Sequence, residues 1–185
     1  MQRYISAHAM VCAERPENPV YCHRPGVVNV ASRWFQDYFP GRVFFAVKTN
    51  PYYVDALVRS GLRNFDVASV AEIKLVAAVC PEARMAFMHP VKSRLAIQRA
   101  YEDYGVRDFA LDSEAELEKI LSATGNARDL NLLVRISVSN RHSCLNLAGK
   151  FGVSGDAAAR LLFKVRQKAR RVGLCFHAGS QLMSP

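Results

Sequence analysis

The chain has 185 residues, of which 50% are hydrophobic and 22% are charged. This composition excludes a disordered, collagen-like or mini-protein chain and is sufficient for one domain with a sizeable core. No apolar stretch approaches the roughly 20 residues that cross a bilayer, so no membrane partner is expected. The 25 Lys and Arg residues against 16 Asp and Glu residues give a net charge of +9, which fits either a nucleic-acid surface or an affinity for phosphate groups.

The first 41 residues are expected to form an N-terminal extension, because prolines interrupt them at positions 16, 19, 25 and 40. A mildly apolar segment at residues 5–13 is interrupted by Ser6 and His8 and is followed by no clear cleavage site. A secretory signal is therefore not expected, and a cytoplasmic location is predicted. One short strand at residues 19–22 and one helix at residues 27–39 are predicted in this extension.

From residue 42 to residue 185, short apolar runs alternate with amphipathic helical patterns, which is typical of βαβ units and a parallel sheet. The predicted strands are residues 43–47, 65–68, 85–89, 109–111, 130–138 and 174–177. The predicted helices between them are residues 53–59, 71–79, 93–104, 113–122 and 156–171.

The first five predicted strands start at intervals of ~20 to 24 residues, as closely connected β/α units do. The last interval is about twice as long and contains an extra loop at residues 139–154. A complete (β/α)8 TIM barrel needs about 250 residues, so residues 42–185 are predicted to form a partial α/β barrel with about six of the eight strands. An open doubly wound sheet is the alternative, but no GxGxxG turn follows the first strand.

The positive charge is concentrated near the predicted last helix. Apolar residues at helical spacing form one stripe of this helix: Leu161, Leu162, Val165, Ala169 and Val172. The basic residues then occupy the opposite, solvated face: Arg160, Lys164, Arg166, Lys168, Arg170 and Arg171. No nucleic-acid partner is therefore expected.

The five cysteines are scattered and include no CxxC pair: Cys12, Cys22, Cys80, Cys144 and Cys175. They predict neither a disulfide framework nor a zinc site.

Polar residues end or directly follow the predicted strands, and the carboxyl ends of barrel strands are where catalytic residues gather. These residues are Lys48, Asp66, Ser69, His89, Asp112, Arg135, His177 and Ser180. Taken singly, Asp112 is explained as a helix cap and His89 as a turn residue. Lys48 directly follows a buried strand, where poor solvation would favour a neutral amine that attacks carbonyl groups.

Seven sequence strings, in this order, resemble the pyridoxal-phosphate-dependent ornithine, lysine and diaminopimelate decarboxylases, which have an alanine-racemase-like barrel. The strings are AVKTNP (46–51), FDVASVAEI (65–73), HPVKS (89–93), LDSEAELEKI (111–120), VRI (134–136), KFG (150–152) and GLCFHAGSQ (173–181). The resemblance covers residues 19–184, and FDVAS, LDSE and KFG are more similar to the ornithine-type branch. Ala178 replaces the usual valine, and Thr49 is a mild variant.

The resemblance implies pyridoxal 5'-phosphate as cofactor and the decarboxylation of a small basic amino acid, most readily ornithine. By this likeness, Lys48 would hold the cofactor in a Schiff base, His177 would stack on the pyridine ring, and Ser180 would bind the phosphate. Asp66 would keep the imine nitrogen protonated, and Arg135 would lie beside the cofactor. Two further matches are weaker: Glu72, which is equally well explained as a first-turn helix residue, and Lys150, which would support the site edge or a subunit contact.

The likeness supplies no counterpart for the glycine-rich phosphate loop, the glutamate beside the pyridine nitrogen, the last two barrel strands and the C-terminal β-domain. We therefore expect this chain to be inactive by itself, with residues 43–47 and 174–177 as exposed hydrophobic sheet edges. A non-catalytic regulatory or binding relative of the same family is the alternative. The family forms homodimers, and the sequence leaves open whether this chain does.

Overall fold

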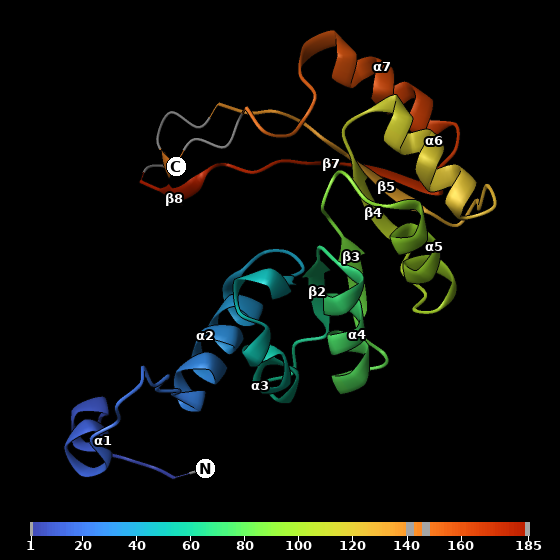
Figure 1. Ribbon diagram of the computed structural model, residues 1–185. Helices are drawn as coiled ribbons and strands as arrows, with labels where there is room; N and C mark the ends of the chain where they lie inside the picture. The colour runs from blue at the N-terminus through green and yellow to red at the C-terminus, as the bar shows by residue number, and fades with distance from the viewer. Residues whose placement is uncertain (1, 140–142, 146–148, 184–185) are drawn as a thin grey trace.

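A computed structural model describes residues 2–139, 143–145 and 149–183 (Figure 1). Its centre is a six-stranded parallel sheet in the order β1-β2-β3-β4-β5-β7. These strands are β1 Phe45–Ala46, β2 Asn64–Val67, β3 Arg84–Phe87, β4 Asp108–Leu111, β5 Asn131–Arg135 and β7 Arg171–Cys175. Because the strands follow one another without the reversal of a doubly wound sheet, the sheet is the arc of a barrel. The predicted fold class is confirmed.

A helix follows each of the first five strands, as the sequence pattern predicts. These helices are α3 Val54–Arg59, α4 Val70–Val79, α5 Arg94–Glu102, α6 Glu114–Ala123 and α7 Gly155–Arg166. Three of them begin with a serine, at positions 69, 93 and 113, whose side chain accepts a hydrogen bond from a backbone N–H in the first turn. The cap of α6 is Ser113, so the prediction that Asp112 caps this helix is wrong.

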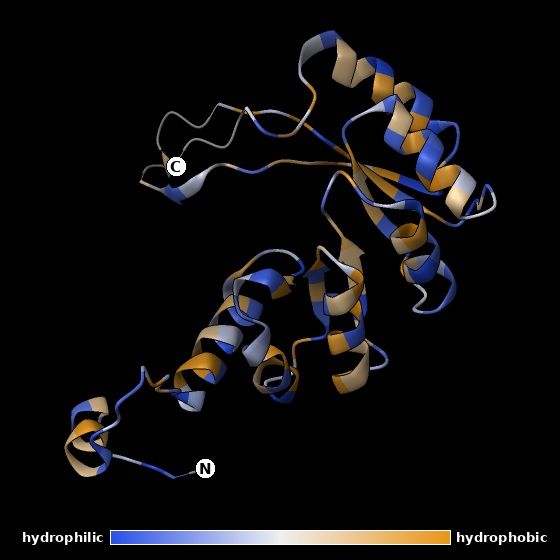
Figure 2. Cartoon of the chain, in the orientation of Figure 1, coloured by the Kyte–Doolittle hydropathy of each residue, from blue (hydrophilic) through white to orange (hydrophobic). Residues whose placement is uncertain are grey.

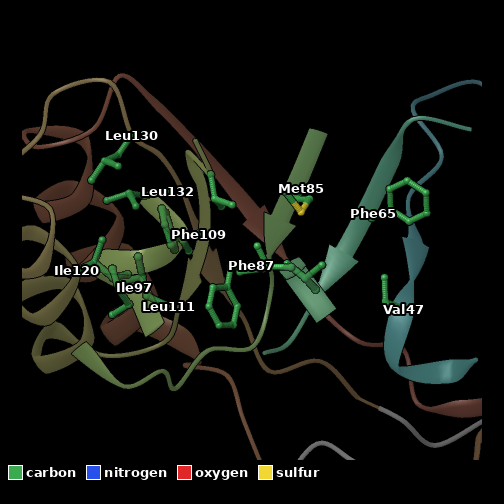
Figure 3. Packing of buried hydrophobic residues seen from close by; sticks show 14 of the residues in the cluster. Val47, Phe65, Met85, Phe87, Ile97, Phe109, Leu111, Ile120, Leu130 and Leu132 are labelled. Atoms are coloured by element: carbon green, nitrogen blue, oxygen red, sulfur yellow. The ribbon is translucent and has the colours of Figure 1, made fainter. Parts of the chain in front are cut away.

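The hydrophobic core lies between the sheet and these helices (Figure 3). Alternate strand residues, such as Phe65, Val67, Phe109 and Leu111, point toward the helices and are fully buried. The helices pack against these residues with one apolar side. Figure 2 shows both hydrophobic and hydrophilic residues along α5 and α6. This packing leaves the other face of the sheet, the inner face, to the remaining strand residues.

The inner face is largely polar where its strands begin. The Arg84 guanidinium donates two hydrogen bonds to the Asp108 carboxylate, at 2.8 and 2.9 Å. Asn131 donates its Nδ2 hydrogen to the same carboxylate at 2.9 Å. Bidentate arginine–carboxylate pairs are rigid and directional, so this group fixes three neighbouring strands at their amino-terminal ends.

Several element boundaries differ from the predicted ones because of long-range pairing. The first strand ends at Ala46, where the chain turns into the short 3-10 helix η1 Val47–Thr49, which is followed by a second one, η2 Pro51–Tyr53. The last helix ends at Arg166, five residues before its predicted end. The backbone N–H groups of Arg170 and Arg171 instead donate to the Leu130 carbonyl, and β7 pairs with β5 from Arg171 onward.

A second, two-stranded antiparallel sheet was not predicted. It joins β6 Ser143–Leu145, from the long loop after β5, to β8 Ser180–Leu182, from the segment after β7. These two short segments can pair only because the barrel arc brings both of them to the same rim. No local sequence pattern reveals this pairing.

The N-terminal extension contains two helices, α1 Ala7–Glu14 and α2 Pro25–Tyr38. The predicted helix is therefore confirmed as α2, whereas the predicted strand at residues 19–22 is wrong. All residues from 11 to 27 are exposed, and no strand of the described residues pairs with residues 19–22 to offer the hydrogen bonds that a strand needs. Figure 1 shows α1 standing apart from the rest of the chain. No helix in the described part of the chain is long and apolar enough to span a membrane.

The two ends of the main sheet, β1 and β7, each have one neighbouring strand. On β7 and the residue after it, Leu174 is 53% exposed and Phe176 is 63% exposed. The predicted hydrophobic edge is thus present at β7, whereas the predicted exposure of residues 43–47 is wrong, because residues 43–46 are half-buried and Val47 is buried.

Candidate functional site

Four of the five sequence-predicted site residues line one cavity on the inner face of the sheet. Asp66 and Arg135 lie on β2 and β5, whereas Lys48 and His177 lie just after β1 and β7. The cavity that these four residues line has a volume of about 390 Å³. Its floor contains Phe44, Arg84, Asp108 and other inner-face residues. An amine, a carboxylate, a guanidinium and an imidazole thus meet at the carboxyl ends of parallel strands, where barrel enzymes carry out their chemistry.

The turn after β1 presents Lys48. Thr49 donates its hydroxyl hydrogen to the Ala46 carbonyl at 2.7 Å, and Asn50 accepts a hydrogen bond from the Tyr52 N–H at 3.2 Å. The neighbouring Val47 is fully buried, whereas Lys48 is exposed. The expectation of a poorly solvated lysine is therefore wrong for this chain, because the sheet is open beside β1 and solvent reaches the amine.

Asp66 lies half-buried on the inner face of β2. Burial raises the pKa of its carboxyl group, and the nearby Glu72 adds to this rise. The positive charges of Lys48 and Arg135 and the backbone N–H of Met88 oppose it. Asp66 is therefore a carboxylate whose proton affinity depends on the two cations that face it.

Glu72 acts first as a helix cap. Its carboxylate accepts a hydrogen bond from the Ala68 N–H at 2.9 Å, and its own N–H donates to the Ser69 hydroxyl at 3.2 Å. This pair resembles a capping box, although Glu72 accepts from the N–H of the residue before the N-cap Ser69 and not from the N-cap N–H. The interpretation of Glu72 as a first-turn residue is confirmed, and its influence on the cavity passes through Asp66.

Phe151, which sequence reasoning did not assign, orients two polar side chains at the cavity rim. The Arg135 guanidinium carbon lies 5.2 Å from the centre of its ring, within cation–π range. The His89 ring meets the same ring edge-on, at 5.3 Å between centroids. His89 also sits in a turn, with its Nδ1 2.7 Å from the Val91 carbonyl oxygen, as the sequence predicted.

Asp112 anchors the loop that carries Phe151. Its carboxylate accepts a hydrogen bond from the Gly152 N–H at 3.0 Å. Gly152 has a φ of +102°, and a Cβ there would lie 2.7 Å from the Ser137 nitrogen. Only glycine fits this approach, which explains the glycine of the KFG string. Lys150, beside it, is exposed.

His177 stands at the cavity mouth, two residues after β7. The Gly179 N–H donates to its Nδ1 at 2.9 Å, so Nδ1 is the acceptor and Nε2 remains for another partner. Ser180 begins β8 and pairs with Leu145. It is not among the described residues that line the cavity.

A buried ion pair supports the same rim and was missed by sequence reasoning. The Lys92 ammonium donates to the Ala110 and His89 carbonyls, at 2.6 and 3.0 Å, and lies 3.0 Å from the Glu116 carboxylate. Both side chains are almost completely buried, and Lys119 donates to the other oxygen of Glu116. Burial lowers the pKa of Lys92, and the charge of Glu116 opposes this shift. Lys92 lies in the HPVKS string, and Glu116 and Lys119 lie in the LDSEAELEKI string. The occurrence of both strings in one chain was the signal that could have indicated this ion pair.

The donor set of the cavity suits a phosphorylated aldehyde better than a metal ion. A primary amine beside a carboxylate and a guanidinium can hold an aldehyde carbon and negative oxygens. Among the residues that the structure describes, no three His, Cys, Asp or Glu side chains form a metal-binding group.

Comparisons with known proteins also indicate a domain that binds a pyridoxal cofactor. A family model described as "Pyridoxal-dependent decarboxylase, pyridoxal binding domain" matches residues 26–185. A lysine/ornithine decarboxylase of Selenomonas ruminantium is 36% identical over 146 residues, which are 77% of this chain and 36% of the relative. An ornithine decarboxylase of Schizosaccharomyces pombe is 32% identical over 164 residues, covering 86% of this chain and 37% of the relative.

Solved structures extend the likeness to three dimensions. A lysine decarboxylase from Selenomonas ruminantium has a TM-score of 0.80 and 29% identity, covering 100% of this chain and 49% of that chain. An arginine decarboxylase of Paramecium bursaria Chlorella virus also has a TM-score of 0.80, with 28% identity, covering 94% of this chain and 47% of that chain. Matching structures include complexes with pyridoxal phosphate.

The chain spans little more than a third of the length of the relatives named above and about half of the matched structures. Within that span, the family match, the barrel arc and the lysine-containing cavity agree, and the cofactor of the family is pyridoxal phosphate. The chain therefore belongs to the pyridoxal-dependent decarboxylase family, of which it carries the pyridoxal-binding domain.

Proposed function

We propose that the inner-face cavity is the lysine-containing half of a decarboxylase site for a basic amino acid. The observation that carries this proposal is that Lys48, Asp66, Arg135 and His177 line one cavity, although 129 positions separate the first of them from the last. Pyridoxal phosphate, when bound, supplies the electron sink that accepts the electron pair left by carbon dioxide.

The side chains of this chain would then hold and tune the reacting groups. Lys48 would provide the amine that holds the aldehyde of the cofactor. Asp66, which interacts electrostatically with Lys48, keeps a proton on the reacting nitrogen. Arg135, oriented by Phe151, supplies positive charge beside the cavity. His177, with its Nδ1 occupied by the Gly179 N–H, presents its ring at the mouth. By the family likeness Ser180 would bind the phosphate, which requires its side chain to reach a cavity that it does not line in this chain.

We propose ornithine as the substrate, and thus a place in the formation of diamines and polyamines. The support is the ornithine-type character of the FDVAS, LDSE and KFG strings. Relatives are named as ornithine and as lysine/ornithine decarboxylases, and a lysine/ornithine decarboxylase from Vibrio vulnificus was solved with putrescine. All five cysteines are free, which is typical of a reducing compartment and supports the cytoplasm as the location.

We further propose that these 185 residues bind the cofactor but do not decarboxylate by themselves. In the described part of the chain, the sheet ends at β1 and β7, and Lys48 is exposed to solvent. Water around the reacting nitrogen weakens every electrostatic effect on which the chemistry depends.

The test is to add pyridoxal phosphate to the purified chain, reduce it with borohydride and map the labelled peptide. We expect the label on Lys48 and its loss in Lys48→Ala, while the exposed outer lysine variant Lys168→Ala keeps it. Label distributed equally over several lysines, or unchanged in Lys48→Ala, contradicts the proposal. Carbon dioxide release from ornithine, lysine and arginine is measured on the same samples. Release by the chain alone would refute the proposed inactivity but support the site.

A further inference from the structure

A second cavity lies at the opposite, amino-terminal ends of the strands. Its volume is about 280 Å³, near the lower limit of about 300 Å³ for small-molecule sites. The first residues of β3, β4, β5 and β7 line it, together with the turn after α5. Four arginines are among the lining residues: Arg84, Arg107, Arg170 and Arg171.

Two of these four arginines have their charge compensated. Arg84 forms a bidentate pair with Asp108, and Arg107 donates to Asp129 at 2.6 Å. No hydrogen bond or ion pair joins the side chain of Arg170 or Arg171 to any other residue in the described ranges 2–139, 143–145 and 149–183. The cavity wall is therefore positively charged, and like charges around one small space favour an anion within it.

Asn131 adds a second, independent feature. It is the cross-strand partner of Arg171 and lines the same cavity. Its Nδ2 donates to Asp108, whereas its Oδ1 is buried and accepts no hydrogen bond from the described residues. Buried acceptors are rarely left unpaired, so a ligand with an O–H donor would complete this side chain.

The sequence alone suggested a different place for these two arginines. It assigned them to the solvated face of the last helix, in one run with Arg160, Lys164 and Arg166. The helix ends at Arg166, and the next residues turn back to start β7. Arg170 and Arg171 thereby leave the helix surface and reach the end of the sheet.

We propose that this cavity binds a small phosphate-bearing anion, with Arg170 and Arg171 as its main ligands and Asn131 as acceptor for a protonated oxygen. The planar guanidinium group fits phosphate oxygens in pairs, and hydrogen phosphate carries the O–H donor that Asn131 lacks. The site lies at the end of the sheet opposite to Lys48. Arg84 and Asp108 line both cavities, but the proposed ligands Arg170, Arg171 and Asn131 line only this one, so the proposal does not rest on the decarboxylase chemistry.

The first measurement is titration calorimetry of the 185-residue chain with inorganic phosphate and with pyrophosphate. The pocket variant is Arg170→Gln with Arg171→Gln, and the matched control is Arg160→Gln with Arg166→Gln, which removes the same charge from α7. We expect at least a tenfold loss of affinity in the pocket variant and less than a twofold loss in the control. Equal losses in both variants, or no phosphate binding by the unmodified chain, would overturn the proposal.

A second measurement, amide NMR of the unmodified chain, needs no variant, so the folding of a variant cannot affect its result. Phosphate should shift the Gly105 amide and the Asn131 side-chain amide. Shifts confined to Gly179, beside His177, would assign the ion to the cofactor cavity and refute the second site. A single-stranded oligonucleotide whose binding falls more in the α7 control than in the pocket variant would assign the charge to a nucleic-acid surface, which also refutes it.

Discussion

Replacing Glu116 with glutamine should strongly destabilise the fold. The Glu116 carboxylate is 3% exposed and receives the Lys92 ammonium at 3.0 Å, the Lys92 N–H at 3.1 Å and the Lys119 ammonium. Glu116→Gln removes the negative charge and turns an amide donor toward one of two cations. Loss of one partner from a buried ion pair costs about 3–5 kcal/mol, which is a third or more of the stability of many domains.

Replacing the partner, Lys92, with methionine should cost less stability than Glu116→Gln. The structure is the reason for this order. Lys92→Met leaves Glu116 paired with Lys119, whose side chain is 25% exposed, so the remaining charge is compensated. Glu116→Gln leaves Lys92 completely buried among carbonyl groups without a counter-ion. Partial compensation by the Ala110 and His89 carbonyls keeps the cost within the range above.

Urea unfolding followed by circular dichroism measures both variants. With a slope of about 2 kcal/mol per molar urea, Glu116→Gln should lower the midpoint by roughly 1.5–2.5 M. The matched control is Glu114→Gln on the same helix, which breaks a surface pair with Lys164 that is about half exposed on both sides and should cost at most about 1 kcal/mol. The reasoning is refuted if Glu116→Gln costs no more than Glu114→Gln, or if Lys92→Met is the more damaging change.

Three further outcomes are expected. Burial raises the pKa of Asp66 above 3.8, so the folded state loses stability as the pH rises through the raised pKa. Without cofactor, the Asp66→Asn variant should thus be more stable than the unmodified chain at pH 7, and this advantage should disappear below about pH 3.8. Urea midpoints that rise equally at both pH values would contradict this. Burial raises the pKa of Cys175 to about 11, so roughly one thiol in a thousand is ionised at pH 8. Iodoacetamide should label the exposed Cys12 and Cys22 long before Cys175, as followed by mass spectrometry. Comparable labelling rates for the three thiols in the folded chain would contradict this prediction. Gly152→Ala should lower the stability by at least about 1 kcal/mol, because its Cβ would lie 2.7 Å from the Ser137 nitrogen. Gly149→Ala, where no atom lies within 4 Å of the added Cβ, is the control, and an equal effect there on thermal unfolding would disprove the steric argument.

The strands and helices of the barrel arc were predictable because their signals are local. Each strand is a short apolar run, and Ser69, Ser93 and Ser113 mark where helices begin. Alternation along a strand also determines that Asp66 and Arg135 share one face of the sheet. The predicted strand at residues 19–22 failed for the complementary reason, since a strand exists only where another strand can pair with it.

The candidate site was partly predictable from position. Lys48, Asp66, Arg135 and His177 each end or follow a strand, and parallel strands bring such ends together. Ser180 lies only three residues beyond His177, yet its pairing with β6 carries it away from the cavity lining. The role of Phe151 depends on a loop that folds back over the rim, and local spacing contains no trace of that contact.

The sequence by itself thus determined the class of fold, the order of its strands and the residues that meet at the carboxyl ends, because periodicity and strand parity depend only on near neighbours. The tertiary structure alone decided the exposure of Lys48, the burial of Lys92 against Glu116 and the placement of Arg170 and Arg171 at the far end of the sheet. Each of these depends on how much solvent and charge surrounds a side chain, and that environment is built by residues 20 to 40 or more positions away once the sheet has curved.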